Sequence, residues 1–175
     1  MQKDIFKYRL KLTKTDELRY ISHLDWQNLI QKIFRRCSIK LVLSEGFNKM
    51  PKISYSPALP IFIESYCELV NFQTQEPLKE DFTENFEKNS PSGLKLLSLH
   101  KQSEDEPKSL ENYIQWAKYI VKFDNLIENN IYKKDELRYI IDNCLSSDNF
   151  LIEKKTKKGI KKTINYRNSI KSFDF

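Results

Sequence analysis

His23 is the side chain in this sequence whose position best suits acid–base or anion-binding chemistry. It follows Ser22, a residue that can cap a helix, and it precedes apolar residues of helical spacing. A helix N-terminus attracts anions through its free amide groups, and an imidazole at that place adds a donor. Two interpretations are open: a part-buried histidine with a structural hydrogen bond, or a contact to a phosphate or a base. His23 is also the one candidate for a general acid or base.

The segment of residues 44–60 is a long connection that combines lysines, aromatic rings and small hydroxyl side chains. Such connections inside compact domains are often functional, and this composition suits phosphate contact and stacking on a base. The alternative is a proline-pinned structural loop whose Phe47 and Tyr55 plug the core. We expect Gly46 to supply a positive φ or a close backbone approach. The candidate RNA-binding residues of this half of the chain are Arg19, His23, Ser44, Glu45, Gly46, Phe47, Asn48, Lys49, Lys52, Ser54 and Tyr55.

A second candidate surface lies near the C-terminus, where lysines gather around Gly159 between two expected strands. A hairpin of this composition is either a solvated turn or a finger that binds a polyanion, with salt-sensitive binding as its signature. The lysines concerned are Lys154, Lys155, Lys157, Lys158, Lys161 and Lys162.

Charge is unevenly distributed along the chain. Residues 1–74 carry 12 Lys and Arg against 7 Asp and Glu, residues 75–149 carry 10 against 15, and residues 150–175 carry 8 against 2. If the two basic ends meet in the fold, they form a surface suited to a polyanion. A general abundance of Lys, Asn and Ile, without a functional role, is the alternative explanation.

No motif of a self-sufficient enzyme is visible, and there is no phosphate-binding glycine loop, dinucleotide fingerprint, nucleophile elbow or zinc pattern. Cys37, Cys67 and Cys144 are far apart, so we expect reduced thiols in a cytoplasmic protein and no metal site formed by this chain alone. The N-terminus lacks a signal-peptide pattern, and no apolar run approaches the ~18 residues of a membrane span. We therefore expect no membrane partner and no catalytic activity of the chain on its own.

The apolar spacing predicts the elements that must position these residues. The first half is expected to contain, in order, a strand at residues 5–13, a helix at 22–37, strands at 40–43 and 61–72, a helix from 77 and a strand from 94. The second half is expected to contain a strand at 116–123, a helix at 133–145 and a hairpin of residues 149–155 and 161–166.

This order predicts an α+β fold made of ferredoxin-like split β-α-β units, two in tandem, with antiparallel sheets and helices on one face. The expected domains are residues 1–100, which hold the Ser-His-Leu-Asp and Ser-Glu-Gly-Phe-Asn segments, and residues 111–175, a truncated β-α-β-β unit with the basic hairpin. Residues 101–110 are the expected linker.

Four motifs together resemble the radical-SAM-associated domain of uncharacterised function. They are Tyr-Ile-Ser-His-Leu-Asp at 20–25, Ser-Glu-Gly-Phe-Asn at 44–48, Pro-Lys-Ile-Ser-Tyr at 51–55 and Pro-Ala-Leu-Pro at 57–60. Their order and spacing make the resemblance specific, and it extends over nearly the whole chain. That family occurs as a short separate protein or fused behind a cobalamin-binding radical SAM module. Its usual His-Pro pair is here Met50-Pro51, so a second histidine is missing.

The resemblance implies association with a radical SAM protein or module. The iron–sulfur cluster and S-adenosylmethionine would belong to that partner, and no cofactor is expected in this chain, which lacks the three-cysteine cluster motif. The family normally continues past a strand of the kind expected near residues 163–170, so we expect this chain to be a piece of a longer polypeptide.

Three functions are open on this evidence. The first is an accessory or C-terminal substrate-recognition domain of a radical SAM system that binds RNA, either tRNA or rRNA, for modification. The second is a protein-interaction domain that docks on the radical SAM partner without touching nucleic acid. The third is a metal-independent RNA endonuclease, suggested by a looser architectural similarity to CRISPR repeat-processing endonucleases. The placement of positive charge favours the first.

Overall fold

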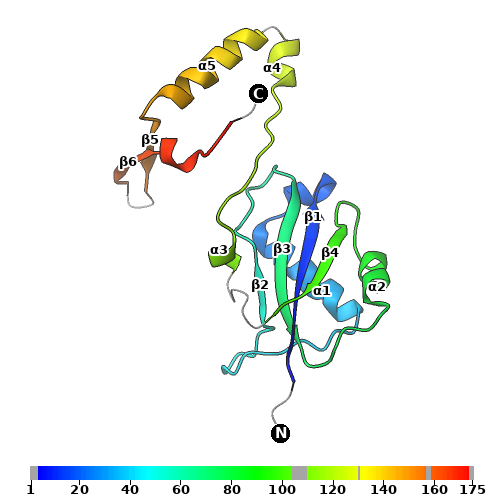
Figure 1. The fold of residues 1–175 in the computed structure, drawn as a ribbon. Coiled ribbons are helices and arrows are strands. Elements are labelled where there is room, and N and C mark those ends of the chain that lie inside the picture. The colour runs from blue at the N-terminus through cyan, green and yellow to red at the C-terminus, as the bar shows by residue number, and fades with distance from the viewer. Residues whose placement is uncertain (1–3, 104–109, 130, 157–158, 174–175) are drawn as a thin grey trace. The chain divides into compact units, whose positions relative to one another are not determined.

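The structure is a computed structural model that describes residues 4–103, 110–129, 131–156 and 159–173. The chain forms two compact units, Met1–Ala117 and Lys118–Phe175 (Figure 1). Of the expected linker at 101–110, residues 104–109 lie outside the described residues. Within the described ranges, no helix has the length and apolar character needed to cross a membrane.

Four antiparallel strands form the sheet of the first unit in the order β2-β3-β1-β4. Their bounds are β1 (Phe6–Lys14), β2 (Ile53–Tyr55), β3 (Ser65–Thr74) and β4 (Leu96–Lys101). Helix α1 (His23–Arg36) connects β1 to β2, and helix α2 (Phe82–Lys88) connects β3 to β4. This β-α-β-β-α-β order is that of a ferredoxin-like unit, so the α+β prediction is confirmed.

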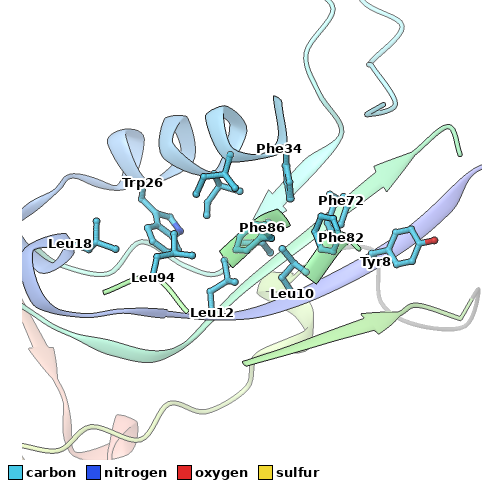
Figure 2. Close-up of a cluster of buried hydrophobic side chains, with 13 residues drawn as sticks. Tyr8, Leu10, Leu12, Leu18, Trp26, Phe34, Phe72, Phe82, Phe86 and Leu94 are labelled. Carbon is cyan, nitrogen blue, oxygen red and sulfur yellow. The ribbon is translucent and has the colours of Figure 1, made fainter. Parts of the chain in front are cut away.

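The core lies between the helices and one face of the sheet, as Figure 2 shows. Alternation along β1 buries Tyr8, Leu10 and Leu12 on that face, since successive side chains of a strand point to opposite sides. Helix α1 packs against this face with a buried stripe at the helical spacing seen in the sequence, formed by Trp26, Ile30, Ile33 and Phe34. The rings of Phe34 and Phe72 pack with centroids 4.6 Å apart. The strand and the helix that flank the candidate site are therefore held by one apolar layer.

Gly93 supplies the close backbone approach at the turn between α2 and β4. Its φ is +82°, and a Cβ at this position would clash with the carbonyl oxygen of Thr15. The Thr13 hydroxyl donates to the Gly93 carbonyl at 2.8 Å, which ties the turn to the end of β1. The same prediction made for Gly46 is wrong, because Gly46 has no positive φ and its nearest contact would be at 4.0 Å.

The edge strand β2 lies inside the segment for which the sequence predicts a loop. Its register pairs Ile53 with Phe72 and Tyr55 with Val70. The predicted strand at residues 40–43 makes isolated bridges instead, among them that of Leu43 with Pro51. Prolines flank β2 without interrupting it, because an edge strand has one side free of ladder hydrogen bonds.

Helix α2 and strand β3 both begin later than predicted. Leu78 donates its amide to the Tyr8 hydroxyl at 3.2 Å, which holds it against the sheet, and α2 starts only at Phe82. Phe62 donates its amide to the Arg19 carbonyl at 2.8 Å within a turn, so β3 starts at Ser65 and not at residue 61.

The outer face of the sheet is partly covered by helix α3 (Leu110–Tyr113). Arg9 of β1 is buried, and its Nε donates to Asn71 Oδ1 at 2.8 Å. Its guanidinium lies 4.0 Å from the centre of the Tyr113 ring, a cation–π contact. Residues that follow the expected linker thus pack on the first unit.

The second unit contains helix α4 (Asp124–Glu128), helix α5 (Lys134–Ser146), the hairpin of β5 (Leu151–Lys155) and β6 (Lys161–Asn165), and the 3₁₀ turn Arg167–Ser169. The predictions of helix and hairpin are confirmed. The predicted strand at residues 116–123 is wrong, since these residues have no regular secondary structure. Their alternation has no partner strand among the described residues, and side chains such as Ile120 stay exposed. The described part of this unit therefore differs from the second ferredoxin-like unit that we expected.

Candidate nucleic-acid interface

The predicted cap of α1 is present in the structure. Ser22 is the N-cap residue, and its Oγ accepts a hydrogen bond from the Asp25 amide at 3.1 Å. The same hydroxyl donates to Asp25 Oδ2 at 2.7 Å. Asp25 thus reaches back to the hydroxyl of the cap and stabilises the start of the helix.

His23 is half-buried at the start of α1 and has neighbours of its own. Its Nε2 lies 2.9 Å from Gln27 Nε2, and because an amide nitrogen can only donate, the ring nitrogen accepts in this geometry. The Tyr55 ring meets it edge-on, with centroids 6.2 Å apart. Tyr55 donates its hydroxyl to the Gln27 carbonyl at 3.3 Å, and burial raises the pKa of Tyr55 to about 12. Both rings are half-buried and contact residues of the first unit, and the RNA contact predicted for them stays a prediction.

A buried lysine below the helix start escaped the sequence analysis. Lys14 is 1% exposed, and its Nζ donates to the Ile21 carbonyl at 3.2 Å. Burial lowers the pKa of Lys14, and the nearby Glu68 carboxylate partly opposes this effect. Glu68 is itself buried and accepts from the Ser56 hydroxyl at 2.8 Å. Lys14 follows Leu12 by two residues along β1, so both side chains are expected on the same, inward face of the sheet. This spacing could have identified Lys14 from the sequence.

Arg19, a predicted RNA contact, is partly exposed and contacts two residues of the first unit. Its Nη1 lies 3.3 Å from Glu64 Oε1, and its Nη2 donates to the Tyr20 hydroxyl at 2.8 Å. The guanidinium also lies 4.9 Å from the centre of the Tyr20 ring. The predicted contact of Arg19 with RNA stays a prediction, because its side chain is 40% exposed beside these partners.

The Phe47 loop, defined as residues 44–50, is closed at its base and open at its tip. The Ser44 amide donates to the Met50 carbonyl at 2.8 Å, and the Met50 amide donates to Ser44 Oγ at 3.0 Å. Phe47 is fully exposed, so it does not fill the core. Tyr55 is partly buried and packs against the hydrophobic core. The other predicted contacts of this loop, which are also exposed, are Glu45, Gly46, Asn48 and Lys49.

The structure separates the Phe47 loop from His23. Lys14, whose Nζ reaches the helix start, pairs with Ser65 at one end of the sheet, whereas the bridges that lead into the loop involve Thr74 at the other end of β3. Lys52 is exposed just before β2, and Ser54 pairs with Asn71 on β2. The predicted contacts of the first unit thus form two groups.

The lysines of the C-terminal hairpin are brought together. Lys154 lies directly opposite Lys162, and Lys155 lies directly opposite Lys161. All four side chains are exposed. Lys161 lies 3.4 Å from Glu153, and Lys154 lies 5.4 Å from the centre of the Tyr166 ring. The remaining predicted contacts, Lys157 and Lys158, lie outside the described residues.

A pocket of about 310 Å³ lies at the C-terminal end of α1 and includes Cys37 and Asp81 in its wall. Burial, together with Asp81, raises the pKa of the Cys37 thiol, which disfavours the reactive thiolate. Cys67 and Cys144 are exposed free thiols. Across the described residues, no group of three or more His, Cys, Asp or Glu side chains is arranged to hold a metal ion.

Comparison with known proteins gives one family. The family model described as "Uncharacterized protein conserved in bacteria (DUF2344)" matches residues 7–175. Neither the curated proteins nor the solved structures gave a significant match. Because the family match runs from β1 through the lysine hairpin to the last residue, this chain belongs to that uncharacterised bacterial family.

Proposed function

We propose that this chain is the substrate-recognition part of a radical SAM system and that it binds RNA through the lysine hairpin β5–β6. The observation that carries the proposal is the pairing of lysine with lysine at two successive positions of the ladder. Like charges directly opposite in an antiparallel pair destabilise it by up to about 1 kcal/mol each. Because two such pairs destabilise the hairpin, we infer that their positive charge serves to bind an anionic ligand.

The ribbon presents this charge on both of its faces. Successive residues of a strand point to opposite sides, so the pair Lys154–Lys162 lies on one face and the pair Lys155–Lys161 on the other. One carboxylate, that of Glu153, is placed to compensate Lys161. Phosphates on either side of the ribbon would neutralise the remaining charge and release counterions, which is the main source of affinity for nucleic acid.

The Phe47 loop supports RNA over a simpler polyanion. A fully exposed phenylalanine on a loop closed by backbone hydrogen bonds is suited to stacking under an unpaired base. Such stacking contributes about 1–3 kcal/mol for each base. Lys49, exposed in the same loop, supplies a cation for contact with a phosphate.

The radical SAM part of the proposal comes from the sequence motifs. In this proposal the partner supplies the iron–sulfur cluster and S-adenosylmethionine, and the chain described here supplies recognition in the cytoplasm. Co-purification of the two proteins, each produced with its own tag, tests the association.

The RNA part is tested by removing charge from the hairpin. The variant K155Q/K161Q is compared with K79Q/K88Q, which removes the same charge from exposed lysines beside and on α2. Binding of a mixed-sequence single-stranded RNA is measured by fluorescence anisotropy at two salt concentrations. We expect the hairpin variant to bind more weakly and to lose about 1.4 from the slope of log K against log salt, because each lost phosphate contact removes about 0.7. Equal affinities of the two variants would refute the proposal.

A further inference from the structure

A second exposed surface lies where the turn before β3 packs on the 3₁₀ helix η1 (Asp16–Tyr20). We call it the Tyr20–Phe62 surface. It consists of four apolar side chains that are 36–75% exposed: Tyr20, Ile61, Phe62 and Ile63. The rings of Tyr20 and Phe62 meet edge to face, with centroids 5.7 Å apart. Neighbouring exposed apolar side chains of this kind mark interaction sites more often than single ones do.

The backbone beneath this surface is held in a strained conformation. Phe62 has a φ of +75°, which costs a bulky residue about 1–3 kcal/mol. Its amide donates to the Arg19 carbonyl at 2.8 Å, which holds the turn in place. Glu64 Oε1 accepts from Arg19 at 3.3 Å and from the Asp16 amide at 3.1 Å, so one carboxylate joins the turn to η1. This anchored turn leaves the Phe62 ring 75% exposed, although burial would have released free energy.

The charges beside this surface are negative. Asp16 and Glu17 of η1 are exposed, and Glu64 of the turn is half-buried. Arg19 is the single Lys or Arg in η1 and in the turn of residues 57–64, and Glu64 already pairs with it. In a chain with a net charge of +6, this is a local reversal of sign. Such a rim repels phosphates and attracts lysine and arginine.

We propose that the Tyr20–Phe62 surface docks a helix of a protein partner, one that places aliphatic side chains between lysines and arginines. The two aromatic rings would bury against the aliphatic side chains, and the acidic rim would pair with the basic ones. The identification of that partner as the radical SAM protein rests on the proposed function, whereas the chemistry of the surface does not. RNA binding and protein docking then use different surfaces of the chain.

The proposal is tested with two synthetic helical peptides of the same leucine pattern, one with lysine and one with glutamate at every polar position. Binding to the full chain is measured by isothermal titration calorimetry. We expect the lysine peptide to bind and the glutamate peptide to bind at least about tenfold more weakly, the effect of ~1.4 kcal/mol of charge complementarity. Equal binding of the two peptides would overturn the charge argument.

Matched substitutions locate the binding site. F62S should lower the affinity for the lysine peptide by about tenfold or more, since a central aromatic contact often contributes over 1 kcal/mol to binding. I120S, at a side chain that is 79% exposed compared with 75% for Phe62, should leave it unchanged. An unchanged affinity of F62S would contradict the proposal. So would a wild-type dimer that F62S converts to a monomer in sedimentation, because the occupant would then be a second copy of the chain.

RNA affinity is measured in parallel on the same samples. If K155Q/K161Q loses RNA affinity while the peptide fails to bind the wild type, the docking inference is wrong and the proposed RNA function stands. If F62S loses the peptide while no variant affects RNA affinity, the RNA proposal fails and the docking surface stands.

Discussion

At the scale of single residues, a buried cation joins the sheet to the start of α1. The Lys14 ammonium reaches the Ile21 carbonyl, one residue before the Ser22 cap, and lies near the buried Glu68 carboxylate. Removal of a buried cation leaves its carbonyl partner and the nearby carboxylate without a positive charge in a poorly solvated place, which costs stability. The position of the helix N-terminus therefore depends on a residue of β1.

We predict that K14M loses about 1–3 kcal/mol of unfolding free energy, since the Ile21 carbonyl and the Glu68 carboxylate lose their cation. K11M, at an exposed position of the same strand, is the control and should change little. The measurement is urea denaturation at neutral pH. A loss no larger than that of K11M would contradict the structural role of Lys14.

The same pair of proteins gives a pH prediction. Burial places the pKa of folded Lys14 below its ordinary value of 10.5, so between these two values the unfolded chain binds more protons than the folded one. The unfolding free energy of the wild type relative to K14M must then rise as the pH approaches 10.5. Denaturation at increasing alkaline pH measures the difference in unfolding free energy between the wild type and K14M. A difference that falls with pH would contradict a lowered pKa of Lys14 in the folded protein.

Glycine substitutions separate two positions that look alike in the sequence. G93A should cost about 2–4 kcal/mol, because the new methyl group meets the Thr15 carbonyl and the backbone has a positive φ. G46A should cost less than about 0.5 kcal/mol, since Gly46 has no positive φ and a methyl group there would not clash with the backbone. Thermal unfolding of both variants tests this, and similar melting temperatures would be inconsistent with the turn as described.

His23 gives a further prediction at this scale. H23A should lose about 0.5–1.5 kcal/mol of stability with its hydrogen bond to Gln27. It should leave RNA affinity unchanged, and incubation of the wild type with RNA should yield no cleavage that H23A lacks. RNA cleavage that disappears in H23A would instead support the endonuclease alternative.

At the scale of elements, the hairpin β5–β6 carries a cost in stability that its function would explain. K155E places a carboxylate opposite Lys161 and should stabilise the second unit by a few tenths of a kcal/mol, because a like-charge pair becomes an opposite pair. It should also weaken RNA binding, the usual relation between stability and function at a binding site. Chemical denaturation and anisotropy of one preparation measure both. Destabilisation by K155E, or an unchanged RNA affinity, would contradict the claim that the paired lysines cost stability because they bind RNA.

At the scale of the whole molecule, the strong periodic segments were predictable and the short ones were not. The alternation of Tyr8, Leu10 and Leu12 and the stripe of Trp26, Ile30 and Ile33 match β1 and α1 because burial of a face decides both. By contrast, β2 has three residues, and its pairing with β3 depends on the rest of the sheet. Residues 116–123 alternate as well as β1 does, but no neighbouring strand pairs with them in the described part of the chain.

The candidate site was predictable to a smaller extent. Exposure of the hairpin lysines follows from composition and turn position, since charged residues around a glycine turn remain solvated, whereas the exposure of Phe47 was left open by the sequence. The engagement of Arg19 by Glu64 joins residues far apart in the sequence, so no local pattern reveals it. Tertiary contacts thus gave several of the predicted residues partners within the protein that the sequence does not indicate.

The central claim is that the hairpin lysines bind phosphates, and the salt dependence of RNA binding tests it most directly. Affinity of the full chain for a single-stranded RNA is measured between about 50 and 200 mM salt, the range over which phosphate contacts lose most of their strength. Four lysines at about 0.7 each predict a slope of log K against log salt near −3. A slope near zero, or no binding at the lowest salt, would contradict the account.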